Sequence, residues 1–433
     1  MNIASSKYTR CPLNTNMLNK LFRQNAIPVK YQLNFIHLYL DMGWFGVLSG
    51  STINFLNVYA TRIGATGLQI GLIGAMSAAV NLFLAIPAGL WLQKRNIGHA
   101  MFWTSVFYRI GFLSFALLPW LFSNSGQITF IITITFFMAI PLTPLGVGFT
   151  ALFAEAVPSE YRAHVAGIRN VMFAVTFMFT SLLSGFILDK VPFPIGYQIV
   201  FGIGFIGAAM SSFHLYYIRH ERGENISPLS KPQPDSTSQT NSFRNIFTTL
   251  RLDILRTPFL TILLSLFCFH LAQNLPTPIF PIFNVRALHL NDNQIGIGTA
   301  LFYLTVLIGS TRLRRLVHRL GNKRITGLGM MGMSIYPTIL AFSTKVWHYY
   351  SVSLIGGVFT ALATGAYANY MLEHIPPNDR PTHLAWYNIV LNIALLTGSL
   401  AGPAIADRVG LFSALILFGF IRFAAGAIIL KWG

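Results

Sequence analysis

The sequence predicts an all-α membrane protein in which twelve transmembrane helices form two pseudo-symmetric six-helix bundles. Three observations lead to this prediction: a composition poor in charge, a series of long apolar segments, and a repeated pattern of polar residues. The chain has 433 residues, of which 54% are hydrophobic and 10% are charged, whereas soluble proteins contain about 25% charged residues. A soluble fold of this length could not cover its surface with so few charges.

Twelve apolar segments follow one another along the chain. Each is long enough to cross about 30 Å of hydrocarbon as a helix, in which every backbone polar group is satisfied internally. They lie at roughly residues 33–60, 68–92, 100–122, 127–152, 167–189 and 195–218, and then at 258–283, 294–312, 325–343, 348–371, 385–406 and 411–430.

Polar stretches divide the chain into four parts. These are a cytoplasmic N-terminal tail (1–30), an N-terminal six-helix bundle (31–218), a cytoplasmic linker (219–256) and a C-terminal six-helix bundle (257–433). The tail contains no apolar core followed by a cleavage site, so we do not expect a signal peptide. Apolar residues at helical spacing from Phe243 to Leu255 predict a short amphipathic helix on the inner membrane face. The alternative is that they only begin the seventh span.

The distribution of positive charge predicts the orientation of the chain. The formal net charge is +18, which is also typical of nucleic-acid-binding proteins. Most lysines and arginines, however, fall in the tail, the linker and the loops of one side, among them Arg162 and Arg169, which we assign to the loop between spans four and five. Because cytoplasmic loops carry the excess of positive charge, we expect a cell-membrane protein with both termini in the cytoplasm and no nucleic-acid partner.

An acid, a proline, a base, an amide and an acid recur later in the chain at one constant separation. The pairs are Glu155 and Glu373, Pro158 and Pro376, Arg162 and Arg380, Asn170 and Asn388, and Asp189 and Asp407. A second set, with a slightly longer constant separation, pairs Gln69–Gly71 with Gln294–Gly296 and Lys94 with Arg319. The sequence therefore contains a duplicated unit of six spans, an even number that gives both copies the same orientation in the membrane.

With six plus six spans, a long central loop and basic loops after spans two and eight, the chain resembles the major facilitator superfamily of secondary transporters. The family's loop motif is similar to Gly89–Asn96 and His318–Arg324, where Gln93 and His318 replace the usual acid. Span eleven carries Gly398–Pro403, similar to a family antiporter motif of span five. The resemblance implies that a small solute crosses by alternating access, at a central site lined by helices one, four, seven and ten.

Span one carries four polar or amphipathic residues on one helical face: Asn34, His37, Asp41 and Trp44. Asp41 is the acid that lies clearly within a span, and an intramembrane acid is a functional hypothesis by default. Its proton could exchange with His37, or its charge could offset a cation. The structural alternative is an ion pair with Arg109, which lies at a similar depth, and the two interpretations are compatible.

The C-terminal bundle offers further candidate contacts for the solute. His270, Gln273, Asn274 and Thr277 share one face of span seven, which Pro276, Pro278 and Pro281 must bend. In span ten we expect Tyr367 and Asn369 to contact the solute. Arg422 in span twelve could reach a lipid headgroup, cap backbone carbonyls or attract an anion, and we favour a structural role.

The repeated loop residues are expected to act as hinges and latches. This gating set comprises Lys94, Glu155, Arg162, Asp189, Arg319, Glu373, Arg380 and Asp407. In the predicted orientation Asp189 and Asp407 lie at the outer side and the other six at the inner side.

The sequence gives little support to enzymatic or metal chemistry. We find no phosphate-binding loop, no cysteine and histidine cluster with metal spacing, and no nucleophile elbow. We therefore expect no catalytic residues, no metal and no cofactor, and a monomer whose partners are a small organic solute, membrane lipid and, as a candidate coupling ion, the proton. The solute is expected to be neutral or amphiphilic. A non-transporting receptor or lipid-handling protein on the same fold is the alternative, and an embedded enzyme would have only His37 with Asp41 as a catalytic pair.

Overall fold

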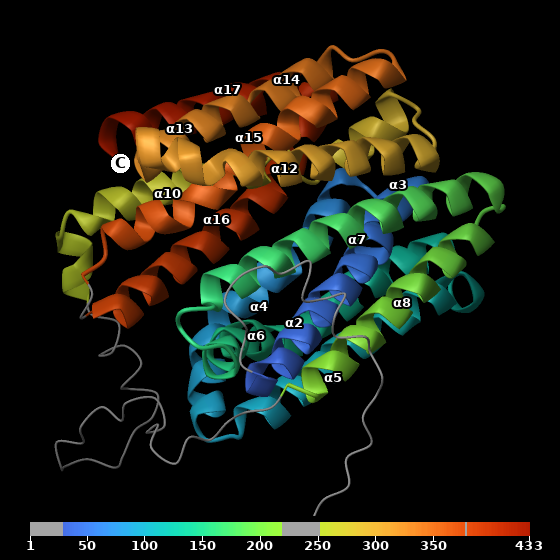
Figure 1. Ribbon diagram of the computed structural model, residues 1–433. Helices are drawn as coiled ribbons and strands as arrows, with labels where there is room; N and C mark the ends of the chain where they lie inside the picture. Colours follow the sequence, from blue (N-terminus) through green and yellow to red (C-terminus); the bar gives the residue numbers. More distant parts are fainter. Residues whose placement is uncertain (1–28, 219–251, 377–378) are drawn as a thin grey trace, which may run out of the picture.

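A computed structural model describes residues 29–218, 252–376 and 379–433 of the protein (Figure 1). Within these ranges the regular elements are all helices. The predicted tail, most of the linker and most of the predicted amphipathic helix lie outside the described residues. The end of that segment is a short 3-10 helix, η2 (Leu252–Arg256), whose Ile254 is buried in the core of the C-terminal half.

The N-terminal half contains the first six predicted spans. Its elements are α2 (Val29–Leu48), the π-helix η1 (Ser49–Ile53), α3 (Asn54–Arg62), α4 (Gly67–Gln93), α5 (Ile97–Leu121), α6 (Asn124–Ala156), α7 (Arg162–Lys190) and α8 (Ile195–Tyr216). The first span is therefore one continuous path of three elements, α2, η1 and α3.

The C-terminal half contains the other six predicted spans. Its elements after η2 are α10 (Phe259–Asn274), α11 (Ile279–Ile282), the π-helix η3 (Phe283–Ala287), α12 (Asp292–Leu320), α13 (Asn322–Met333), α14 (Ile335–Ala341), α15 (Val346–Glu373), α16 (Arg380–Val409) and α17 (Leu411–Trp432). The seventh span consists of α10, α11 and η3, and the ninth of α13 and α14.

Ten helical stretches in the described ranges are long and apolar enough to cross a membrane. The other two predicted spans, 33–60 and 325–343, correspond to helices that are interrupted, at η1 and at Ser334 respectively. Pro337 explains the second interruption, because proline has no N–H to bond the carbonyl of Met333 four residues earlier. The predicted helical membrane fold with two similar halves is thus confirmed, and its first, seventh and ninth spans are interrupted.

Both copies of the duplicated unit begin their second helix with the same local structure. In α4 the backbone N–H of Gln69 bonds the Thr66 hydroxyl, and the Gln69 side chain bonds the Thr66 N–H in return. In α12, Asn291 and Gln294 form the same capping box at the corresponding positions of the second copy. Each box satisfies two backbone donors that a helix start leaves without partners.

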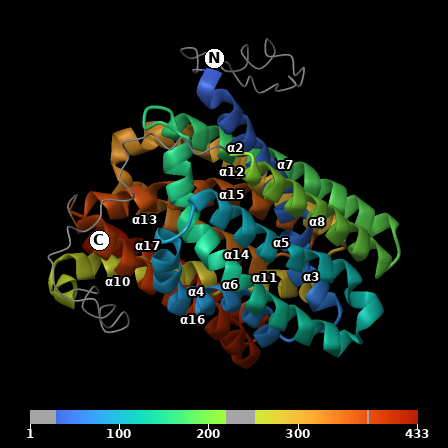
Figure 2. The same cartoon turned by 90° about the horizontal axis from the view of Figure 1, so that it is seen from below.

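The two halves lie one above the other in Figure 1, the N-terminal half in blue and green and the C-terminal half in yellow to red, and Figure 2 gives the view from below. Two helix pairs join them: α7 packs on α12, and α4 packs on α16. These are the second and fifth helices of each copy, which pair crosswise as expected for two related units.

Glycines bring the two halves together at one end, which we therefore call the closed end. It is the end that carries Arg62, Asp189, Asp292 and Asp407. A Cβ added to Gly71 of α4 would lie 2.2 Å from the Ser399 carbonyl oxygen of α16, and one added to Gly296 of α12 would lie 2.7 Å from that of Ser181 in α7. At the opposite, basic end, which carries Lys94 and Arg319, a Cβ added to Gly89 would meet no atom within 4 Å.

Replacing Gly71 with alanine is expected to push α4 and α16 apart, because the new methyl group would overlap the Ser399 carbonyl. Overpacking costs about 1–3 kcal/mol, and about 1.4 kcal/mol is a factor of ten in an equilibrium. We therefore expect thiol labelling at Thr61→Cys, measured in a background without Cys11 and Cys268, to become about tenfold faster. The matched change Gly89→Ala, in the same helix, should leave the rate unchanged, and equal rates in the two variants would contradict this account.

Candidate functional site

Asp41 is the centre of a buried polar cluster in the N-terminal half. Its side chain is about 5% exposed and contacts two arginines: Arg169 Nη2 donates to Oδ2 over 3.4 Å, and Arg109 Nη2 lies 3.6 Å from Oδ1. The hydroxyl of Ser211 donates to Oδ1 over 2.5 Å. Four helices, α2, α5, α7 and α8, therefore meet around one carboxylate.

Arg109 connects this carboxylate to a pair of serines. Its Nη1 donates to Ser212 Oγ over 3.0 Å and to Ser105 Oγ over 3.4 Å, and the two serine hydroxyls are themselves 2.7 Å apart. Arg169 lies over the ring of Phe149, 4.3 Å from its centroid. One acid and two guanidinium groups leave the cluster with an excess positive charge in a region where charges are expensive to bury.

Small residues let the neighbouring helices approach the first span closely enough to form the cluster. A Cβ added to Gly207 of α8 would lie 2.9 Å from the Trp44 carbonyl, and one added to Gly46 of the first span would lie 2.9 Å from the Phe173 carbonyl of α7. Close backbone approach at small residues is the usual way in which membrane helices pack. It brings Ser211 and Arg169 within reach of Asp41.

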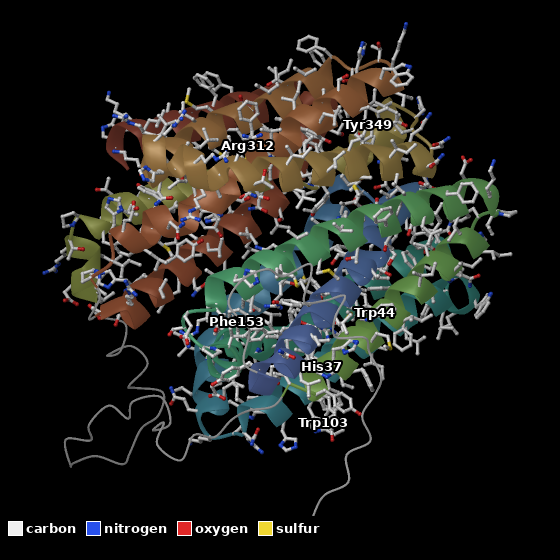
Figure 3. All side chains as sticks on the ribbon, viewed as in Figure 1. His37, Trp44, Trp103, Phe153, Arg312 and Tyr349 are labelled. Atoms are coloured by element: carbon white, nitrogen blue, oxygen red, sulfur yellow. The ribbon has the colours of Figure 1, made fainter. Side chains whose placement is uncertain are left out.

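Two histidines meet one helical turn before Asp41. The Nδ1 atoms of His37 on α2 and His214 on α8 lie 3.0 Å apart, so one ring donates and the other accepts. The ring of Tyr217 stacks on His37 with centroids 5.5 Å apart. Figure 3 shows His37 and Trp44 along α2 in the lower, N-terminal half, with the exposed Trp103 at its edge.

The polar stripe of the first span thus lies mainly inside the N-terminal half. Asn34 is 5% exposed and Asp41 is 3% exposed, and the contacts that the structure gives for His37 and Asp41 are with helices of their own half. The predicted structural pair of Asp41 with Arg109 is present. Arg169, which the sequence assigned to a loop, belongs to α7 and contacts the same carboxylate.

In the C-terminal half, His270 lies among aromatic side chains. It is 4% exposed, its Nε2 lies 3.0 Å from the hydroxyl of Tyr387 on α16, and its ring meets Tyr367 of α15 edge-on at 5.3 Å. Asn274 donates its Nδ2 to the His270 carbonyl over 2.8 Å. The structure therefore brings three of the predicted contacts together, whereas Asn369 on α15 is exposed.

The six gating residues of the basic end are exposed, and two of them bond groups of their own halves. Arg162 donates to the carbonyls of Ala154 and Val157 at the end of α6. Glu373 accepts a 2.6 Å hydrogen bond from Asn322 at the start of α13. Lys94, Glu155, Arg319 and Arg380 are likewise exposed. In this conformation the six residues do not join the two halves by an ion pair among the described residues.

The ion pair that joins the two halves lies at the closed end. Arg62, at the end of α3, donates Nε to Asp292 Oδ1 over 2.8 Å and Nη2 to the Leu290 carbonyl over 2.9 Å. Arg286 donates Nη2 to the Ala65 carbonyl over 2.5 Å in the opposite direction. Beside them is a hollow of about 670 Å³ that both halves line, with Asp189 at its rim.

The two predicted outer acids lie at starts of helices of the other half. Asp407 Oδ1 would lie 3.4 Å from a Cβ at Gly67, in the first turn of α4. Asp189 follows Gly185, whose Cβ would lie 3.0 Å from Asn293 in the first turn of α12. Negative charge is favourable near a helix N-terminus, so Asp407 helps to hold the start of α4 close.

Asp292→Asn is expected to weaken the closed end, because it leaves Arg62 without its carboxylate while the carbonyl contact to Leu290 remains. A partly buried ion pair of this kind contributes on the order of 1 kcal/mol, which predicts a several-fold rise in labelling at Thr61→Cys. The charge swap Arg62→Asp with Asp292→Arg restores the pair and should restore slow labelling. If the swap labels as fast as the single variant, the ion pair does not hold this end closed.

Sequence reasoning missed the residues that come together only in three dimensions. Arg169 had one signal, its position two turns after Arg162 on the same stretch of helix. His214 and Ser211 carried none, because a histidine and a serine in an apolar segment are unremarkable until their partners on α2 are known. The described residues contain no group of three or more histidine, cysteine, aspartate or glutamate side chains placed to hold a metal ion.

Two similar helical halves that meet at one end of twelve membrane segments define the fold of a membrane transporter. The family profile described as Major Facilitator Superfamily matches residues 33–269 and 262–433. The chain therefore belongs to the major facilitator superfamily, and the resemblance noted in the sequence is confirmed.

Individual relatives are distant. The chain is 22% identical over 302 residues to the cis,cis-muconate transport protein of Acinetobacter baylyi, across 68% of this chain and 69% of that protein. It is 27% identical over 151 residues to multidrug resistance protein 2 of Bacillus subtilis, across 35% of this chain and only 38% of that relative's length. The crystal structure of a D-xylose–proton symporter covers 93% of this chain and 97% of its own, with 15% identity and a TM-score of 0.69. This likeness shows the fold alone.

Proposed function

We propose that this protein is a secondary transporter that moves a small organic solute across the cell membrane by alternating access. The observation that carries the proposal is the placement of the contacts between halves. Glycine crossings and the Arg62–Asp292 ion pair lie at the closed end, while the gating residues of the basic end stay within their own halves. Two rigid halves joined at one end can rock about a site between them.

The basic end is proposed to face the cytoplasm, and both termini with it. Bases gather there, at Lys94 and Arg95 in one half and at Arg319, Lys323 and Arg324 in the other, and cytoplasmic loops carry such an excess. The described conformation is then closed to the outside. Outward opening requires separation at the glycine crossings and the Arg62–Asp292 pair, and closure at the gating residues of the inner side.

Asp41 is proposed as an anchor of coupling and the histidine pair as the proton carrier. Two guanidinium groups contact the Asp41 carboxylate, with Nη2 atoms 3.4 and 3.6 Å from its oxygens. His37 and His214 share one N–H between their Nδ1 atoms, so a second proton converts the acceptor ring into a donor and breaks the bond. The groups that face the pair are Asp41 and, just past the end of α8, Tyr217.

His270, Gln273, Asn274, Tyr367 and Asn369 are proposed as solute contacts from the C-terminal half. They supply aromatic faces and hydrogen-bonding groups without a carboxylate, which suits an organic molecule. From the N-terminal half we propose Trp44 on α2, which is partly exposed, and not Asn34, which is buried within that half. The relatives bear names that refer to muconate, tetracycline and multiple drugs, all organic compounds, which supports this class.

Flux into proteoliposomes tests the proposal. The purified protein should accumulate at least one compound from a panel of muconate, tetracycline, xylose, a nucleoside and a lipophilic cation, under an imposed pH gradient. Compounds that are transported should also raise the thermal unfolding temperature, because a ligand that binds only the folded state stabilises it. Binding without flux of any compound would instead favour the receptor or lipid-handling alternative.

His214→Asn is expected to flatten the pH dependence of transport, because it removes the second ring of the histidine pair and leaves Asp41 with both arginines. The measurement is the initial rate of uptake from pH 5 to pH 8, with the exposed His99→Asn as control. An unchanged pH profile in His214→Asn would exclude the pair as the proton carrier.

Asp41→Asn should abolish accumulation of the solute and lower the free energy of unfolding by about 3–5 kcal/mol, since it leaves two buried guanidinium groups without a carboxylate.

A further inference from the structure

A third buried arginine lies in the C-terminal half, far from any carboxylate among the described residues. Arg422 is in the middle of α17 and is 4% exposed. Its guanidinium donates three hydrogen bonds to backbone carbonyls: Nε to Ala272 over 3.2 Å, Nη2 to Gln273 over 2.9 Å and Nη1 to Met333 over 3.2 Å. Of the three possibilities that the sequence left open, the structure thus shows the capping of carbonyls.

The three carbonyls are those that lose their α-helical N–H donor at two helix breaks. In an α-helix each carbonyl accepts from the N–H four residues later. For Ala272 and Met333 these positions are Pro276 and Pro337, which have no N–H. For Gln273 the position is Thr277, whose N–H instead bonds the Asn274 carbonyl over 3.2 Å, while its hydroxyl donates to the Gln273 carbonyl over 3.1 Å.

The guanidinium and the carbonyls each lower the free-energy cost of burying the other. A backbone carbonyl without a partner in a membrane interior costs several kcal/mol, and so does a buried guanidinium without compensation. The carbonyl oxygens carry partial negative charge, and the ring of Phe280 on α11 lies 5.6 Å from the guanidinium. Arg422 therefore satisfies the ends of α10 and α13 together and is itself stabilised there.

Glycines on α17 place the arginine within reach of both breaks. A Cβ added to Gly419 would lie 2.1 Å from the Thr338 hydroxyl of α14, and one added to Gly426 would lie 2.6 Å from the Gly327 carbonyl of α13. At the separation that relates Asp189 to Asp407, the position in the first copy that is equivalent to Arg422 is Gly204, which packs against Thr52 of η1. The sixth span of the first copy thus meets a break in its half as well, but only the C-terminal copy supplies a cation.

We propose that Arg422 is a positioning residue that clamps the α10–α11 break and the α13–α14 break of the C-terminal half at one fixed bend. The clamp sets the orientation of the last turn of α10, which carries His270, Gln273 and Asn274. Its consequence for solute binding rests on the proposed function, whereas the clamp itself does not.

The test removes the Arg422 donors and then restores the backbone N–H groups that Pro276 and Pro337 lack. Arg422→Met removes the three hydrogen bonds while keeping an unbranched apolar side chain, so the thermal unfolding temperature of the purified full chain should fall by about 5–10 °C. Adding Pro276→Ala and Pro337→Ala returns an N–H to Ala272 and Met333, and should recover at least half of that loss. Pro281→Ala, a proline whose position serves neither carbonyl, is the matched control and should recover none.

Arg422→Lys keeps the charge but loses the planar set of guanidinium donors. Its thermal unfolding temperature should lie between those of the parent protein and Arg422→Met. It also provides a folded variant if Arg422→Met does not fold. With Arg422→Lys, recovery by Pro276→Ala and Pro337→Ala supports the clamp. The clamp would be overturned if the proline substitutions lowered the unfolding temperature further in addition to the loss from the arginine substitution, or if Pro281→Ala restored it equally well. Because the readout is unfolding, absence of solute flux would count against the proposed function and leave this result intact. If flux is found, the affinity for the solute should fall and recover in parallel.

Discussion

The membrane interior offers no water to satisfy charges and backbone polar groups, and this constraint shapes the whole structure. Each half satisfies its own groups internally, with Asp41, Arg109 and Arg169 in one and Arg422 with three carbonyls in the other. Along most of its length, the surface between the halves therefore does not have to satisfy these buried charges and carbonyls. It includes the glycine crossings, one hydrogen bond from the Ser181 hydroxyl to the Gly296 carbonyl, the stacked rings of Phe177 and Tyr303, and the ion pair of the closed end.

The two copies of the duplicated unit have kept their architecture and diverged in chemistry. Both start their second helix with a capping box and cross the other half through their second and fifth helices. The N-terminal copy holds ionised groups and a histidine pair, which suit the handling of protons. The C-terminal copy holds His270 among Tyr367 and Tyr387 beside a proline break, which suits the recognition of an organic molecule.

The sequence predicted what depends on local pattern and failed where distant residues meet. Apolar length and the internal repeat were enough for the fold, because hydrocarbon thickness and backbone hydrogen bonding leave few alternatives. Arg109 could be matched to Asp41 by depth alone. Arg169 could not, because its polar surroundings resembled a loop, and neither Arg62–Asp292 nor His37–His214 has any sequence signature. Arg422 shows the remaining gap: the prolines of span seven predicted one bend, but not the break before Pro337, nor that one side chain would serve both.

The central claim is that separation at the closed end accompanies approach at the basic end. Double electron–electron resonance measures both distances, with spin labels on Val191 and His289 at the closed end and on Arg95 and Lys323 at the basic end, in the parent chain and in Asp292→Asn. The account predicts that the variant gains a population with a longer closed-end distance and an equal population with a shorter basic-end distance. A longer closed-end distance with an unchanged basic-end distance would contradict it.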